Sequence, residues 1–226
     1  MIESQNSDGH APLHCFSIVQ HNCRGSNLVF LTLFSLIRSR NVSFVCLQDP
    51  PLFQGSPLRA PGFQCYVSNI FDFKKSVATY VNLSFAKDFN YLCFSPTVDV
   101  LQLGLSRNNG IPVLGGFDSF FLINTYNKQV DGVNTVKAAH LFTDDFHPSL
   151  VVGDLNLHML YTDPTRNMSS AEHRKGEHYF RVAGLRGFAI IKEPGVYTRT
   201  MDNTNDRPSI INYTLANRQL ADFVKT

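Results

Sequence analysis

The sequence has little charge for its length and no tryptophan. Charged residues make up 17% of its 226 positions, against about 25% in an average globular protein. The formal net charge is only +2, which excludes a protein that holds DNA through a strongly basic surface alone. The aromatic content of 12% excludes a disordered chain. A function on nucleic acid would therefore depend on a local site.

Three other features are missing from the sequence. The five cysteines include no CxxC pair and no Cys/His spacing typical of zinc ligands, which favours free thiols in a reducing compartment. Residues 1–14 are polar and lack the apolar segment of a signal peptide. No run of about 18 uncharged apolar residues predicts a transmembrane helix. We therefore expect an intracellular protein, nuclear or cytoplasmic, without a membrane segment.

Strand and helix patterns alternate from the start of the chain. Apolar runs at 15–20 and 42–47 predict buried strands, and apolar residues at helical spacing predict a helix over 28–38 with Asn27 as its cap. This order favours a layered α/β fold. Residues 1–14 are expected to form a flexible tail and residues 15–226 one domain. Further strands are predicted at 76–82, 98–103, 117–125, 150–152, 188–191, 196–199 and 210–215, and helices at 134–146 and from a capping box at Ser169 to about residue 186.

Polar side chains follow three of the predicted strands directly. Asn22 comes after the first strand, Asp49 after the second, and Asp154, Asn156 and His158 after the strand at 150–152. In layered α/β folds, strand ends deliver side chains into a common crevice. On an extended backbone, the three last residues would point to one side. Each residue taken alone fits a turn, a strand end or a cap, whereas the combination favours a functional edge.

Four motifs in this order resemble the endonuclease/exonuclease/phosphatase superfamily, and are most similar to the apurinic-endonuclease-like domain of non-LTR retrotransposons. They are VQHN (19–22), LQDPP (47–51), GDLNLH (153–158) and SIINYTLA (209–216). That branch typically reads Q-x-N, Q-E-P-P, G-D-F-N-x-H-H, S-x-I-D and finally S-D-H. The resemblance covers about residues 15–216. It implies a four-layered α/β/β/α sandwich of two packed mixed sheets flanked by helices.

The resemblance also implies a chemistry, the hydrolysis of phosphodiester bonds in DNA with Mg²⁺ or Mn²⁺. It assigns Asp49 and Asn22 to the metal, and Asp49 is one methylene shorter than the Glu of the family, which would weaken metal binding. It assigns Asp154 to the attacking water and Asn156 to the phosphate. Tyr126, in INTYN, matches a phenol on the phosphate side, and a core tyrosine is an equal alternative for it.

Two departures from the family pattern count against activity. Asn212 stands where the family has a second acid, and an amide cannot add charge to a metal site. No Asp-His pair follows Asn212 before Thr226, although the family places its catalytic histidine there. We therefore expect an incomplete C-terminal end that lacks the last strand or strands. His158, the histidine near the crevice, is then the candidate catalytic histidine.

Three functions stay open on the sequence. The first is a DNA-nicking endonuclease domain of retrotransposon type. The second is a catalytically inactive endonuclease-like module that binds nucleic acid or protein. The third is a phosphatase or another phosphodiesterase of the same superfamily, which the retrotransposon-like motifs favour least.

Overall fold

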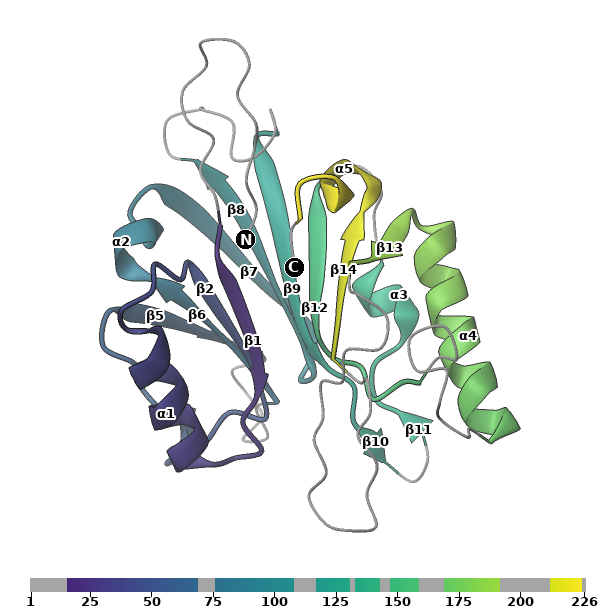
Figure 1. Ribbon diagram of the computed structural model, residues 1–226, viewed down its shortest axis with the longest axis horizontal. Helices are drawn as coiled ribbons and strands as arrows, with labels where there is room; N and C mark the ends of the chain where they lie inside the picture. The colour runs from purple at the N-terminus through teal and green to yellow at the C-terminus, as the bar shows by residue number, and fades with distance from the viewer. Residues whose placement is uncertain are drawn as a thin grey trace.

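Two β-sheets pack face to face, and helices cover the outer face of each sheet (Figure 1). The structure is a computed structural model. It describes residues 16–68, 76–107, 117–130, 133–142, 147–158, 169–191 and 212–224. Within these ranges, no helix combines the length and the apolar character needed to cross a lipid bilayer.

The first sheet has four strands in the order β1-β2-β6-β5. Strand β1 runs parallel to β2, and β6 is antiparallel to both of its neighbours. Every residue of β2 is buried, as its continuous apolar pattern predicts. The bounds are β1 (Ile18–Asn22), β2 (Phe44–Gln48), β5 (Phe63–Val67) and β6 (Val77–Asn82), with a separate small hairpin of β3 (Leu52–Phe53) and β4 (Ser56–Pro57).

The second sheet has six strands in the order β13-β14-β12-β9-β8-β7. Strands β9 and β12 are parallel, and the other neighbours are antiparallel. The bounds are β7 (Phe89–Thr97), β8 (Val100–Arg107), β9 (Ser119–Tyr126), β12 (Ser149–Asp154), β13 (Phe188–Ile190) and β14 (Asn212–Asn217).

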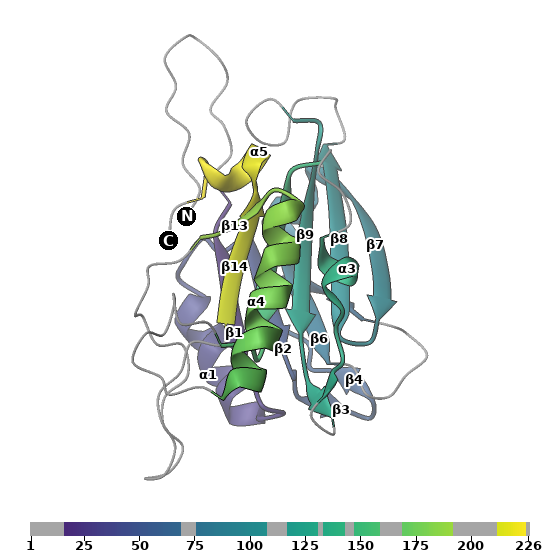
Figure 2. The same cartoon turned by 90° about the vertical axis from the view of Figure 1, so that its right-hand side faces the viewer.

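Helices form the two outer layers. Helix α1 (Asn27–Ile37) covers the first sheet, and its cap is Ser26, whose Oγ accepts from the backbone N of Val29 at 3.3 Å, so the predicted Asn27 cap is wrong by one residue. Helices α3 (Ala138–Leu141) and α4 (Ser170–Leu185) cover the second sheet (Figure 2). The predicted capping box of α4 is confirmed, because Ser169 and Glu172 exchange hydrogen bonds. Two short helices, α2 (Leu83–Ala86) and α5 (Arg218–Ala221), follow β6 and β14.

Three apolar clusters hold the layers together. The cluster between the sheets includes Phe16, Phe44 and Phe120, all at 0% exposure. A second cluster packs α1 on its sheet around Phe30 and Tyr80. A third packs α3 and α4 on theirs. The α/β/β/α sandwich implied by the motifs is therefore confirmed, whereas the absence of last strands stays a prediction.

The helix predicted over 134–146 is wrong at its start. Val133–Asn134 is a strand, β11, which pairs with β10 (Gln129–Val130), and among the described residues of this range helix occupies Ala138–Leu141. Side-chain hydrogen bonds hold this hairpin: Thr135 Oγ1 accepts from the backbone N of Lys128, and Asn127 Oδ1 accepts from that of Val136. Such bonds compete with helix. The strand predicted at 196–199 lies outside the described residues.

Candidate functional site

Four strands end at the same edge of the sandwich, the lower end in Figure 1. Asn22 is the last residue of β1 and Asp49 follows β2 directly, while Tyr126 ends β9 and Asp154 ends β12. Because β1 is parallel to β2 and β9 to β12, and β1 contacts β12 across the interface, these four residues meet. The structure thus brings together residues that are distant in the sequence: Asn22 and Asp154 are 132 positions apart.

Asp154 is the buried centre of this edge, at 2% exposure. Its Oδ2 accepts a hydrogen bond from Asn22 Nδ2 at 2.8 Å, and its Oδ1 accepts one from the backbone N of Asn156 at 3.1 Å. The first bond joins the two sheets. Both bonds fix the orientation of the carboxylate.

The chain turns directly after Asp154, so the expectation of an extended backbone through residue 158 is wrong. Asn156 has a φ of +48°, a left-handed conformation that Asn adopts more readily than most residues. Its Nδ2 donates to the backbone O of Asn127 at 2.9 Å. Leu155 and Leu157 are buried at 0% and 2% exposure and anchor the turn. His158 lies half-buried beyond this turn, and its role stays a prediction.

Asp49 also has a left-handed backbone, with a φ of +46°. Its N donates to the backbone O of Ser76 at 2.7 Å, and its own carbonyl accepts from the N of Gly25 at 2.8 Å. Burial and the nearby Asp49 charge raise the pKa of the Cys23 thiol to about 12. Sparsely populated backbone conformations of non-glycine residues cluster at functional sites, and both Asp49 and Asn156 adopt one here.

Tyr126 lies among the carboxylates. Burial, followed by the charge of Asp49, raises the pKa of its phenol, and the charges of Asp154 and Asp99 act in the same direction. A side-chain hydrogen bond with Asn22 opposes these effects. The phenol therefore stays protonated at neutral pH and can donate a hydrogen bond.

Two residues directly after Tyr126 belong to the site and were not singled out from the sequence. Asn127 is fully buried, and its Nδ2 donates to the backbone O of Leu155 at 2.8 Å, which secures the turn after Asp154. Lys128 Nζ donates to Ser76 Oγ at 2.7 Å and lies 5.2 Å from the ring centroid of Tyr126. The sequence did hold a signal for them, because Asn127 and Lys128 directly follow a strand. The same position at a strand end identified Asn22 and Asp49.

A buried amide pair connects the sheets beneath this edge. Asn124 Oδ1 accepts from Gln48 Nε2 at 2.7 Å. Asn124 Nδ2 lies within hydrogen-bond distance of Thr79 Oγ1 and of the backbone O atoms of Leu47 and Ala78, at 3.0 to 3.2 Å. Since Asn124 precedes Tyr126 by two residues and Gln48 precedes Asp49, the pair fixes the relative position of both.

Two carboxylates at this edge have the chemistry that a hard divalent cation prefers. The charges of Asp49 and Asp154 both raise the pKa of the Tyr126 phenol, and carboxylate oxygens are the ligands that Mg²⁺ prefers. Asn212, the degenerate position, pairs with Asp154 across β12 and β14. The described residues contain no group of three or more His, Cys, Asp and Glu side chains suited to a metal.

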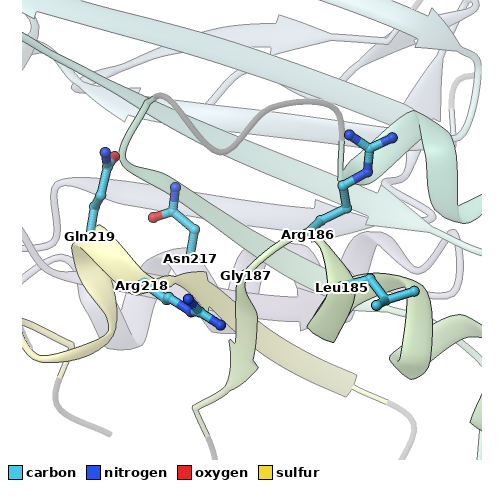
Figure 3. Close-up of a pocket in the computed structure, with 6 residues that line it drawn as sticks. All are labelled: Leu185, Arg186, Gly187, Asn217, Arg218 and Gln219. Carbon is cyan, nitrogen blue, oxygen red and sulfur yellow. The ribbon is translucent and has the colours of Figure 1, made fainter.

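A pocket at the other end of β14 lies apart from the site (Figure 3). Its volume is about 170 Å³. None of the residues of the candidate site lines it; the lining residues are Leu185, Arg186, Gly187, Asn217, Arg218 and Gln219.

The fold is that of the endonuclease/exonuclease/phosphatase proteins, as the motifs implied. The endonuclease domain of TRAS1, a telomere-specific non-LTR retrotransposon, has a TM-score of 0.69 and 15% identity, over 94% of this chain and 90% of that one. The 3′ phosphatase NExo from Neisseria, bound to a product DNA hairpin, has a TM-score of 0.60 and 16% identity over the same shares. Humanized D. rerio TDP2 has a TM-score of 0.53 and 11% identity, over 89% and 83%. No protein-family model and no curated protein sequence matches the chain.

Proposed function

We propose that this protein hydrolyses phosphodiester bonds in DNA with Mg²⁺ or Mn²⁺, as a nicking endonuclease domain of retrotransposon type. The observation that carries the proposal is the convergence of Asn22, Asp49, Tyr126 and Asp154 at one edge, with Asp154 bonded across the sheets to Asn22. By the resemblance, these are the positions at which the retrotransposon branch has its metal residues, its water-orienting acid and a phosphate-side phenol. The similarity in fold to the TRAS1 endonuclease domain supports the same reading.

The chemistry divides among these side chains. Asp154, held in orientation by its two hydrogen bonds, would orient an attacking water and accept its proton. Tyr126 would donate to a phosphate oxygen and stabilise the charge that develops there. Asn156, fixed by its bond to Asn127, would hold the same phosphate. Asp49 and Asn22 would hold a divalent cation, which supplies charge neutralisation when bound.

DNA is the proposed substrate because structures of this fold contain it. NExo is bound to a product DNA hairpin, and a D. rerio TDP2 structure of TM-score 0.52 is complexed with a single-strand DNA product. The small net charge of +2 agrees with contacts made at this edge rather than over the whole surface.

A plasmid-nicking assay with Asp154→Asn tests the proposal. We expect Mg²⁺-dependent conversion of supercoiled to open-circular DNA by the unsubstituted protein, and at least about a hundredfold loss in Asp154→Asn, as for other proton-transfer residues. Asp118→Asn is the matched control, because Asp118 is exposed and lies at the far end of β9. Equal rates for Asp154→Asn and the control would contradict the proposal.

A catalytically inactive, DNA-binding module is the second candidate, and Asn212 favours it. Asn212 pairs directly with Asp154, so the missing acid would have stood beside the water-orienting carboxylate. For an inactive module, the unsubstituted protein binds DNA without nicking it. Asn212→Asp would then gain Mg²⁺-dependent nicking that a further Asp154→Asn substitution abolishes.

A further inference from the structure

Lys128 is a cation held in place at the edge of the site. It follows β9 by two residues, and its Nζ donates to Ser76 Oγ at 2.7 Å. The same ammonium lies 5.2 Å from the ring centroid of Tyr126, within the range of a cation–π interaction. A lysine side chain loses considerable rotamer freedom when it is fixed in this way.

Ser76 connects this cation to the Asp49 turn. Ser76 is fully buried. Its backbone O accepts from the N of Asp49 at 2.7 Å, while its Oγ accepts from Lys128. Ser76 thus positions both the Lys128 ammonium and the backbone of Asp49. The charge of Asp49 in turn raises the pKa of the Tyr126 phenol.

The anchor leaves the ammonium suited to an anion. An ammonium carries three N–H donors, and the bond to Ser76 uses one, so Lys128 can donate to a phosphate oxygen without leaving its position. Ser76 is a neutral hydroxyl, so this bond does not neutralise the positive charge. The Tyr126 phenol, a donor at neutral pH, lies beside it and can donate to the same group.

We propose that Lys128 is a phosphate-binding residue that contacts the backbone of the DNA strand at this edge. The inference rests on the proposed function for its ligand, and it adds a contact that the motifs did not assign. Its positive charge would offset the repulsion that Asp49 and Asp154 exert on an approaching phosphate. Lys128 would therefore contribute to DNA binding and not to the activation of the attacking water.

The salt dependence of DNA binding tests this role separately from hydrolysis. Binding of a short fluorescein-labelled DNA duplex is measured by anisotropy in EDTA, over about 50 to 200 mM NaCl. EDTA prevents metal-dependent cleavage and removes competing divalent cations. The variants are Lys128→Met, which keeps the side-chain length, Lys128→Arg, which keeps the charge, and the control Lys87→Met. Lys87 is exposed and follows α2, at the end of β6 that lies away from the site.

We expect Lys128→Met to weaken binding roughly fivefold to tenfold near 0.1 M salt and to lower the slope of log K against log[salt] by about 1. Lys128→Arg and Lys87→Met should keep the slope of the unsubstituted protein. An unchanged slope in Lys128→Met, with thermal unfolding showing a folded protein, would overturn the inference. If Lys128→Met shows this change of slope but the unsubstituted protein does not nick DNA, the proposed function alone is overturned. If no variant shows salt-dependent binding, the proposed function and the role of Lys128 are both overturned.

Discussion

The buried amide pair beneath the site makes the strongest stability prediction. Asn124→Leu changes the side chain's volume little and removes every hydrogen bond of the Asn124 amide. Gln48 Nε2 would lose its 2.7 Å partner and keep only the Cys46 backbone O at 3.4 Å. Thr79 Oγ1, at 3.2 Å, would lose a donor as well. The substituted chain would therefore contain buried polar groups with poor partners.

The size of the effect follows from these lost bonds. Leaving a buried polar group without its partner costs about 1 to 3 kcal/mol. Gln48 would bear most of this cost because it is fully buried, and the hydroxyl and two carbonyls would add smaller terms. We expect Asn124→Leu to lower the free energy of unfolding by about 3 kcal/mol, measured as a shift of the urea midpoint at constant m-value.

A double substitution separates this mechanism from simple strain. Gln48 Oε1 has no hydrogen-bond partner among the described residues, so replacing both amides removes the largest part of the unsatisfied set and leaves only the Thr79 hydroxyl and the two carbonyls without the Asn124 donor. Gln48→Leu/Asn124→Leu should recover at least about 1 kcal/mol relative to the sum of the single changes. Asn90→Leu, at an exposed position of β7, should stay within about 0.5 kcal/mol of the unsubstituted protein. A loss below 1 kcal/mol in Asn124→Leu, or strict additivity, would refute the reasoning.

Three further predictions concern folding. Gly153→Ala should lower the free energy of unfolding by about 3 kcal/mol or more, because a Cβ there overlaps Thr125 O and lies 2.6 Å from Thr125 Cγ2. Gly184→Ala in α4, where a Cβ meets nothing within 4 Å, should raise it by about 0.5 to 1 kcal/mol, and equal urea midpoints for the two variants would contradict this. Ser169→Ala should cost about 1 kcal/mol, since it removes the cap of α4, and an unchanged midpoint would contradict the capping role. Burial raises the pKa of the Cys46 thiol to about 12, so this thiol ionises first in the unfolded chain and lowers stability from about pH 8.5 upward, by about 1 kcal/mol per pH unit for this group. Because the Cys23 thiol has a similarly raised pKa, Cys46→Ala should reduce the loss without abolishing it, and the same slope in that variant would argue against the role of Cys46.

The layered fold was predictable because its strands are strongly patterned. Strand β2 is buried on both faces, so an unbroken apolar run marks it. Strand β7 lies at the edge of its sheet and exposes Leu92 and Phe94 at 70% and 58%. Its pattern is correspondingly weak, and the sequence did not predict it. Strand β5, also at a sheet edge, was missed as well.

The candidate site was predictable where a polar side chain lies at a strand end or directly after it. Asn22 and Asp154 end their strands and Asp49 follows one, and the structure places all three at the same edge. The role of Ser76 was not predictable, because its contacts to Asp49 and Lys128 cross between elements that no local pattern relates. The turn at Asn156 was missed because alternation along a strand holds only while the backbone stays extended.

The Mg²⁺ dependence of plasmid nicking in Asp49 variants tests the central claim most directly. Asp49 is the proposed ligand of the cation, and its side chain is shorter than the Glu of the related motif. We expect Asp49→Glu to lower the Mg²⁺ concentration needed for half-maximal nicking, and Asp49→Asn to raise it by about tenfold or more. Nicking with the same Mg²⁺ dependence in Asp49→Asn and the unsubstituted protein would contradict the account.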